Sequence, residues 1–199
     1  MNIWTPHDPS LVLDLPLHIS DGVKFMDRSA YGHKVEVTGA LWTPQGRSFD
    51  GIDDYISGLV KPSIGSVLLW VSWQRSAKAS GLYQSLLGDM VYQHTANDFL
   101  YLENGSQYFA YRPPLGKWEH LAFVWTTNLN SSVNLYVNTI IQGRGYVNDN
   151  GHLNFTRLAT RENLTNFLKV IIGEVIVYNR ALTAPERQHH YLATKWRYR

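Results

Sequence analysis

The stretch of sequence that decides the fold reads Gly46-Arg-Ser-Phe-Asp-Gly-Ile-Asp-Asp-Tyr-Ile56. Asp50-Gly51 is a turn signal, because glycine adopts positive φ angles freely and aspartate hydrogen-bonds to its own backbone. A strand is therefore expected to enter this turn and another to leave it. Phe49 is placed to enter the core, while Asp53 and Asp54 are placed to meet solvent at the start of the second strand.

Two longer runs predict central strands that are buried on both faces. The runs Ser66–Trp73 and Val170–Tyr178 are almost continuously hydrophobic, as such strands are. Shorter apolar runs separated by Gly, Asn, Asp and Pro fill the rest of the chain, which is the all-β pattern. The remaining strands are expected over residues 11–17 (with Leu11, Leu13, Leu15 and Leu17 on one face), 35–41 and 47–56.

A hairpin is expected in the second half of the chain. Apolar residues alternate with others over Trp118–Trp125 and Val133–Val137, which gives each strand two distinct faces. Residues 128–132 supply the turn between them, and Gly143-Arg-Gly145 is expected to end the second strand.

A short helix is expected near the C-terminus. Thr183-Ala-Pro-Glu186 fits a capping box, so the helix should begin there and continue to about Leu192. No linker, repeat or low-complexity tract interrupts the chain. Residues 1–199 are therefore expected to form a single domain.

Charge and cysteine usage exclude several classes of function. The formal net charge is +2, and basic residues cluster only in Lys195-Trp-Arg-Tyr-Arg199, which argues against nucleic-acid binding. The chain has no Cys, so it has no disulfide, thiol nucleophile or thiolate zinc site. No stretch is long and apolar enough to span a membrane. The first nine residues lack the parts of a secretory signal peptide, so if Met1 is the native start we expect synthesis in the cytoplasm without export.

The apolar content indicates extensive packing. Hydrophobic residues make up 44% of the chain, aromatic residues 13% and charged residues 17%. The aromatic side chains suit both the core of a sandwich and a sugar-binding surface. A monomer of this size would not bury all of these apolar side chains, so we expect a small oligomer or the subunit of a particle.

Three motifs in register resemble laminin-G-like, concanavalin A-like jelly-roll domains. The first runs from Asp27-Arg-Ser-Ala-Tyr-Gly-His33 through Val37–Trp42 to the Gly46–Ile56 stretch. The second is the strand pair 118–125 and 135–138, and the third is Gly173–Glu186. The resemblance implies an all-β, two-sheet antiparallel jelly-roll sandwich with a short C-terminal helix. The whole-chain form is similar to stand-alone domains of phage and environmental viral genomes.

The resemblance also implies a structural calcium ion near the sheet edge. Asp50, Asp53, Asp54 and Glu174 offer the oxygen atoms that calcium prefers. In the resembling family the 50–54 turn lies close to the Gly173-Glu174 strand, so we expect Ile52 to be anchored there. The alternative is that Asp53 and Asp54 only cap a turn.

The chain lacks a recognisable catalytic motif. Glucanases of this fold carry alternating carboxylates on one strand, and no such run is present. His189-His190 are adjacent, so they cannot chelate a metal as an i, i+4 pair does. Turn or surface positions are expected for all eight histidines. No catalytic residue and no cofactor other than calcium is therefore expected.

Three functions remain open on the sequence alone. The first is a non-catalytic virion component, a capsid decoration or tail-associated protein, whose partners are copies of itself, a capsid or tail protein and glycans of the host. The second is a carbohydrate-binding module of a cellular organism, with an extracellular location. The third is a glycoside hydrolase whose carboxyl pair comes from distant strands.

Overall fold

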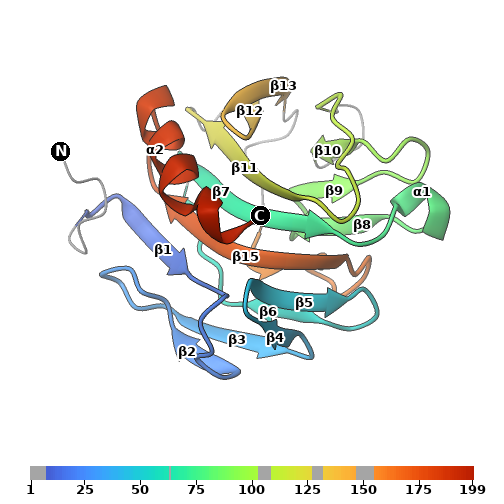
Figure 1. Cartoon of the computed structure of the whole chain (residues 1–199), viewed down its shortest axis with the longest axis horizontal. Helices are drawn as coiled ribbons and strands as arrows, with labels where there is room; N and C mark the ends of the chain where they lie inside the picture. Colours follow the sequence, from blue (N-terminus) through green and yellow to red (C-terminus); the bar gives the residue numbers. More distant parts are fainter. Residues whose placement is uncertain (1–7, 63, 103–108, 127–131, 147–154) are drawn as a thin grey trace.

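Two antiparallel sheets pack face to face around one apolar core in the computed structural model (Figure 1). The structure describes residues 8–62, 64–102, 109–126, 132–146 and 155–199. Sheet A has the order β13–β12–β11–β7–β15–β5–β4, with β1 also paired to β15, and sheet B has the order β10–β9–β8–β14–β6–β3–β2. The expected jelly-roll sandwich is confirmed.

The elements have the following bounds. Sheet A contains β1 (Leu11–Leu15), β4 (Leu41–Thr43), β5 (Gly46–Asp50), β7 (Gly65–Trp73), β11 (Trp118–Trp125), β12 (Ser132–Val137), β13 (Ile140–Tyr146) and β15 (Lys169–Tyr178). Sheet B contains β2 (Lys24–Met26), β3 (Lys34–Thr38), β6 (Tyr55–Ser57), β8 (Gln84–Leu87), β9 (Val91–Gln93), β10 (Leu100–Leu102) and β14 (Arg157–Leu158). The helices are α1 (Ala77–Ser80), α2 (Ala184–Thr194) and the 3-10 helix η1 (Lys195–Arg197).

The central strand β7 is buried along its whole length, as its sequence predicts. Val67 and Leu69 belong to the core between the sheets, whereas Leu68 belongs to a second apolar cluster on the outer face of sheet A. Helix α2 lies across that outer face (Figure 1). Trp70 Nε1 donates a hydrogen bond to Thr194 Oγ1 at 2.8 Å, which ties the end of the helix to β7.

The 46–56 stretch connects the two sheets. Its first half is β5 of sheet A and its second half is β6 of sheet B, so the Asp50-Gly51 turn carries the chain from one sheet to the other. Phe49 is 1% exposed and lies in the core, as expected. Ile52 is 71% exposed, so the prediction that it is anchored was wrong. It projects from the turn itself, outside the space between the sheets.

A β-bulge changes the face of the first strand. Leu11 is opposite Tyr178 and Leu13 is opposite Val177, so one residue is extra between them on β1. Leu13 lies in the core, as expected, but Leu11 lies in the outer cluster beside Tyr178. The expectation that the four leucines share a face was therefore wrong for Leu11.

Glycines in β13 permit close packing. Strand β12 ends at Val137, so Gly143 and Gly145 do not end it but lie within the next strand. A Cβ atom at Gly143 would be 2.5 Å from the Phe109 carbonyl oxygen, and one at Gly145 would be 2.4 Å from a Leu102 methyl carbon. These positions hold glycine because neighbouring segments lie directly against the strand.

The capping box of α2 is confirmed. The Glu186 carboxylate accepts hydrogen bonds from Thr183 N and Thr183 Oγ1, both at 2.7 Å, and it pairs with Arg180 at 2.8 Å. The helix continues to Thr194, two residues beyond the expected end. No described helix has the length and apolar character needed to cross a membrane.

Two histidines are buried between this helix and sheet A, contrary to the expectation of turn or surface positions: His120 on β11 and His190 on α2 itself. His120 is 3% exposed and its ring lies 5.2 Å from that of Trp70, while His190 is 2% exposed and 3.0 Å from the Tyr178 hydroxyl. Burial lowers the pKa of His120 to about 3 and that of His190 to about 4, so both rings are neutral in the folded protein at neutral pH.

Candidate functional site

The three aspartates of the 50–54 turn lie together. One carboxylate oxygen from each of Asp50, Asp53 and Asp54 lies within 4.8 Å of the others. Two of these carboxylates already stabilise the turn: Asp54 Oδ2 accepts a hydrogen bond from Asp50 N at 2.8 Å, and Asp50 Oδ1 accepts one from Ile52 N at 2.7 Å. These bonds account for Asp50 and Asp54 as turn formers, and calcium at this position stays a prediction. Asp53 is exposed as expected, but Asp54 is only 6% exposed, so the expectation that it meets solvent was wrong: its carboxylate turns inward to the Asp50 backbone N–H.

Glu174 does not join these aspartates. Strand β5 does lie beside β15, but its register places Asp50 opposite Lys169, five residues before Glu174. The neighbouring ladder places Glu174 opposite Trp70, on the outer face of sheet A. The structure therefore brings together three of the four candidate calcium ligands and places the fourth in a different site.

That site is a cleft of about 380 Å³ on the outer face of sheet A. Its walls come from β1 and the loop after it, from the loop after β2, from β15, and from the end of α2 with η1. We call it the carboxyl cleft, and its lining residues are Asp14, Pro16, His18, Arg28, Glu174, Ala193, Thr194 and Arg197.

The two carboxyl groups of the cleft hold protons unusually tightly. Burial, helped by the charge of Asp14, raises the pKa of Glu174 to about 7, and Glu174 is only 7% exposed. Burial also raises the pKa of Asp14 to about 6, against the opposing charge of Arg28. Asp14 is opposite Ile176 in the ladder, so it is a diagonal neighbour of Glu174, and such pairs have Cα atoms about 7–8 Å apart.

Neither carboxylate has a polar partner among the described residues. No hydrogen bond or ion pair within that part of the chain involves the side chain of Asp14 or Glu174, although charges act on both at longer range. Arg28 is paired with Asp21 at 3.1 Å instead. Two carboxyl groups in one cleft can share a proton near neutral pH or accept hydrogen bonds from a ligand.

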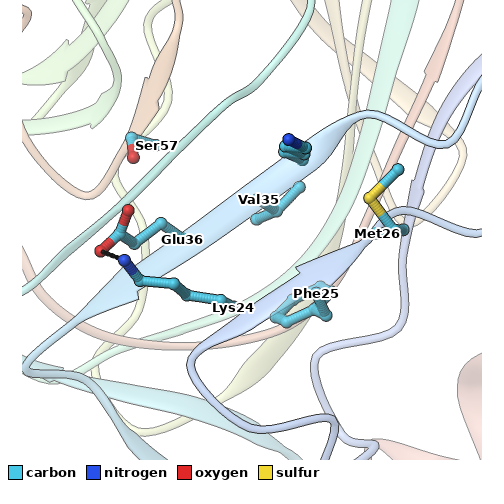
Figure 2. Close-up of a pocket in the computed structure, with 7 residues that line it drawn as sticks. Lys24, Phe25, Met26, Val35, Glu36 and Ser57 are labelled. Carbon is cyan, nitrogen blue, oxygen red and sulfur yellow. Dashed lines mark ion pairs between the residues drawn. The ribbon is translucent and has the colours of Figure 1, made fainter.

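A second hollow lies over the edge of sheet B, at β2 and β3 (Figure 2). Its volume is about 470 Å³, and an ion pair between Lys24 and Glu36 at 3.0 Å crosses one side of it. Figure 2 shows Met26 at the other end of the hollow and Ser57 beyond Glu36. Both charged side chains are more than half exposed, so solvent screens the pair and the hollow holds no buried polar group for a ligand.

A group of aromatic rings occupies the other end of sheet B. Tyr83, Tyr92, His94 and Tyr101, which we call the aromatic patch, come from β9, β10 and the segments flanking β8 and β9. The Tyr92 and Tyr101 rings stack at 5.7 Å, and Tyr83 meets His94 edge-on at 4.9 Å. Tyr83 is 40% exposed, Tyr92 and His94 are half-buried, and Tyr101 forms the base of the patch with 9% exposure.

Polar groups border the patch. Asn97 Nδ2 donates to the Tyr101 hydroxyl at 3.1 Å, and Arg161 pairs with Asp89 at 2.6 Å close to Tyr92. Burial and the neighbouring tyrosines raise the pKa of Tyr92, so its hydroxyl is neutral and can donate a hydrogen bond. The patch therefore combines exposed ring faces with hydrogen-bonding groups at their edges.

The sequence carried different signals for the two sites. Asp14 interrupts an apolar strand run and could have been singled out as a polar group in a buried position. The tyrosines of the patch are spread over about twenty residues, and only the pairing of β9 with β10 and β8 brings them together. No local pattern predicts that cluster.

Solved structures of similar fold include enzymes and binding domains. A Trypanosoma rangeli sialidase complex matches with a TM-score of 0.70 at 15% identity, covering 94% of this chain and 33% of the sialidase chain. The botulinum neurotoxin serotype D binding domain matches with a TM-score of 0.65 at 14% identity, covering 92% of this chain and 52% of that one. The botulinum neurotoxin type G receptor binding domain matches with a TM-score of 0.64 at 14% identity, covering 93% of this chain and 51% of that one.

These likenesses show the fold alone. This chain spans a third of the length of the sialidase chain and about half that of the toxin domains. A search of curated proteins found no match. The family model described as Laminin_G_3, of the concanavalin A-like lectin/glucanases superfamily, matches residues 50–186, which is more than half of the chain. The chain belongs to the Laminin_G_3 family of concanavalin A-like lectin/glucanase domains.

Proposed function

We propose that this domain is a non-catalytic module that binds glycans on the aromatic patch. The observation that carries the proposal is the group of ring faces at the surface of sheet B, with Tyr83 40% exposed and Tyr92 beside it at 5.8 Å. A sugar ring has an apolar C–H face and a rim of hydroxyl groups. It therefore fits a surface that offers aromatic faces and flanking hydrogen-bonding groups.

The arrangement of the patch favours a firm platform. Tyr101 lies beneath Tyr92 with 9% exposure, and its hydroxyl accepts a hydrogen bond from Asn97. His94 Nδ1 accepts a hydrogen bond from Ala96 N at 3.0 Å, which fixes the ring beside Tyr83. Side chains held in this way lose little conformational freedom when a ligand binds, which favours affinity.

Binding of labelled protein to a glycan array, followed by affinity measurements on the glycan bound best, tests the proposal. The variants Tyr83→Ala and Tyr92→Ala should each weaken binding about fivefold or more, because losing the buried contact of an aromatic ring costs about 1–3 kcal/mol. Tyr31→Ala is the matched control, since Tyr31 is 52% exposed and also stacks on a histidine, His33, at 5.8 Å. Equal affinity in all three variants would contradict the proposal.

The carboxyl cleft favours a second candidate function, glycoside hydrolysis. Asp14 and Glu174 lie on adjacent strands, and their raised pKa values suit a group that donates a proton near neutral pH. The binding function is preferred because no alternating run of carboxylates crosses a sheet face. A hydrolysis assay, given in the Discussion, separates the two.

The setting of the domain stays a prediction. Assembly on a virus particle, with a capsid or tail protein and further copies of the chain as partners, is an expectation from the sequence that the fold does not address. A terminase, portal or capsid gene beside this one would favour the virion over a cellular carbohydrate-binding protein.

A further inference from the structure

The carboxyl cleft contains negative charge that nothing in the described chain neutralises at close range. Glu174 is 7% exposed, and neither its carboxylate nor that of Asp14 has a hydrogen bond or ion pair within the described residues. Unpaired carboxylates in a buried setting are costly, and a protein tolerates them most readily where a ligand supplies the missing partner.

The basic groups at the cleft are occupied elsewhere. Arg28 is paired with Asp21 at 3.1 Å. The Arg197 guanidinium lies against the rings of Trp196 and Tyr198, 5.0 and 5.8 Å from their centroids. No guanidinium nitrogen of either arginine lies within 4.0 Å of a carboxylate oxygen of Asp14 or Glu174, although the Arg28 backbone N–H donates to the Asp14 carbonyl oxygen at 2.9 Å. The arginines therefore act on the carboxyl groups only at a distance.

The titratable groups nearest the cleft carboxyl groups are neutral or bound to backbone amides. Burial and the charge of Glu174 raise the pKa of Tyr198, so its phenol is neutral. Burial lowers the pKa of His18, and His18 Nδ1 lies 3.4 Å from the Gly173 carbonyl oxygen. The Asp27 carboxylate accepts hydrogen bonds from the backbone N–H groups of Asp14 and Ser29. The cleft therefore presents two carboxyl groups as acceptors and no cation held between them.

A cation that donates hydrogen bonds fits two carboxyl groups better than a metal ion does. Among the described residues, the acidic and histidine side chains close enough to hold a metal are those of the 50–54 turn, and the cleft does not join them. A primary ammonium group has three donors and no acceptor, so it can bind both carboxylates at once. A cleft of about 380 Å³ is also large enough for more than the ammonium group alone.

An aromatic side chain is hydrogen-bonded to the backbone of a residue that lines the cleft. Trp42 is 44% exposed, and its Nε1 donates to the His18 carbonyl oxygen at 3.1 Å. The indole ring is thereby held beside a lining residue of the cleft. A ring at this position can contact the apolar face of a sugar or the edge of a cation.

We propose that the carboxyl cleft binds the primary ammonium group of an amino sugar, with Asp14 and Glu174 accepting its hydrogen bonds and Trp42 contacting the sugar ring. This goes beyond the proposed function, because it adds a second glycan site with its own sugar class and does not depend on the aromatic patch. The cleft lies on the outer face of sheet A and the aromatic patch on sheet B, so the two sites can be tested separately.

Titration calorimetry on the whole chain with a glucosamine trimer tests the proposal. At pH 7 the glucosamine trimer should bind at least tenfold more tightly than the N-acetylated trimer, which lacks the ammonium group. At pH 5 both carboxyl groups are protonated, because their pKa values are about 6 and 7, and the affinity should fall at least tenfold. Equal affinity for the two trimers would overturn the proposal.

Variants locate the binding. Asp14→Asn and Glu174→Gln should each lower affinity for the glucosamine trimer at least tenfold, and Trp42→Ala should lower it severalfold. Glu36→Gln is the matched control, because Glu36 is an exposed carboxylate on sheet B. Unchanged affinity in both cleft variants, or n-butylamine binding as tightly as the trimer, would contradict the assignment.

Failure of this inference is distinguishable from failure of the proposed function. Two results together would overturn the cleft proposal alone. In the first, Tyr83→Ala and Tyr92→Ala lose binding to the glycan found on the array; in the second, the unchanged protein does not bind the glucosamine trimer. Glucosamine binding that depends on Glu174 but not on the aromatic patch would support the cleft and contradict the patch as the glycan site.

Discussion

Glu174 is an acidic side chain that the folded protein holds at a cost. Its pKa is raised to about 7, so between about pH 4.5 and 7 the unfolded chain loses its proton before the folded chain does, and stability falls as the pH rises through that range. The variant Glu174→Gln removes this cost. At pH 8 it should raise the free energy of unfolding by roughly 2 kcal/mol, or about 5 °C in Tm, with a much smaller gain at pH 5.

Thermal melting at the two pH values checks this, with Glu36→Gln as the control that should change nothing. A gain that is the same at pH 5 and pH 8 would mean that Glu174 titrates normally. Such a result would remove the electrostatic basis of the cleft.

The sequence predicted individual residues where a strong local rule applied. Phe49 follows strand alternation, and Asp50 and Gly51 follow turn chemistry, so their positions are as expected. Glu174 was grouped with the aspartates because the two motifs lie on adjacent strands, but strand register separates it from Asp50 along β15. Register depends on long-range pairing, which residue types alone do not specify.

At the scale of elements, the C-terminal helix depends on its first turn. Glu186 bonds to Thr183 and Arg180, and its pKa is held at about 2 chiefly by the hydrogen bond from Arg180. Glu186→Ala should lower the free energy of unfolding by about 1 kcal/mol at pH 7, since the cap and a partly exposed ion pair are lost together. Urea unfolding measures this, with the exposed Gln188→Ala as a control that should cost little.

The pH dependence of that loss follows from the lowered pKa. The carboxylate stabilises the folded state above the unfolded pKa of about 4.5, and its contribution disappears as the pH falls toward 2. If Glu186→Ala lowers the free energy of unfolding by as much at pH 3 as at pH 7, the residue acts by packing and not by charge.

The 50–54 turn gives a second prediction for an element. The carboxylates of Asp50 and Asp54 already accept backbone hydrogen bonds, so millimolar calcium should leave the melting curve unchanged and chelator should have no effect. A bound ion at a hundredfold excess over its Kd would add about 2.7 kcal/mol. An upward shift that Asp53→Ala abolishes would show a calcium site instead.

Elements were predicted best where periodicity was uniform. Strands β7, β11, β12 and β15 and the capped helix α2 all follow their sequence patterns. The stretch at Gly143 was misread because a glycine pair resembles a strand end, whereas Phe109 and Leu102 lie against those glycines. Leu11 was misplaced because a β-bulge leaves no trace in the alternation of apolar residues.

For the whole molecule, the account predicts binding without turnover. A reducing-sugar assay with laminarin, lichenan and agarose should show no release of ends above background. Turnover that disappears in Glu174→Gln but persists in Glu36→Gln would make the carboxyl cleft a catalytic site and contradict the binding-only function.

The fold class could be predicted from three separated motifs, and the family model that matches residues 50–186 confirms it. The aromatic patch could not, because its rings become neighbours only when β8, β9 and β10 pair. The carboxyl cleft likewise depends on the C-terminal segment that follows α2 lying against sheet A, with Arg197 among its lining residues. Sites assembled from distant segments need the tertiary structure.

A crystal structure of the domain with the glycan that it binds best on an array tests binding on the aromatic patch most directly. We expect sugar density against the rings of Tyr83 and Tyr92, with hydroxyl groups near Arg161 or Asn97. Sugar density that leaves these rings bare, with the glycan seated only elsewhere, such as in the carboxyl cleft or over Lys24 and Glu36, would contradict glycan binding on the aromatic patch.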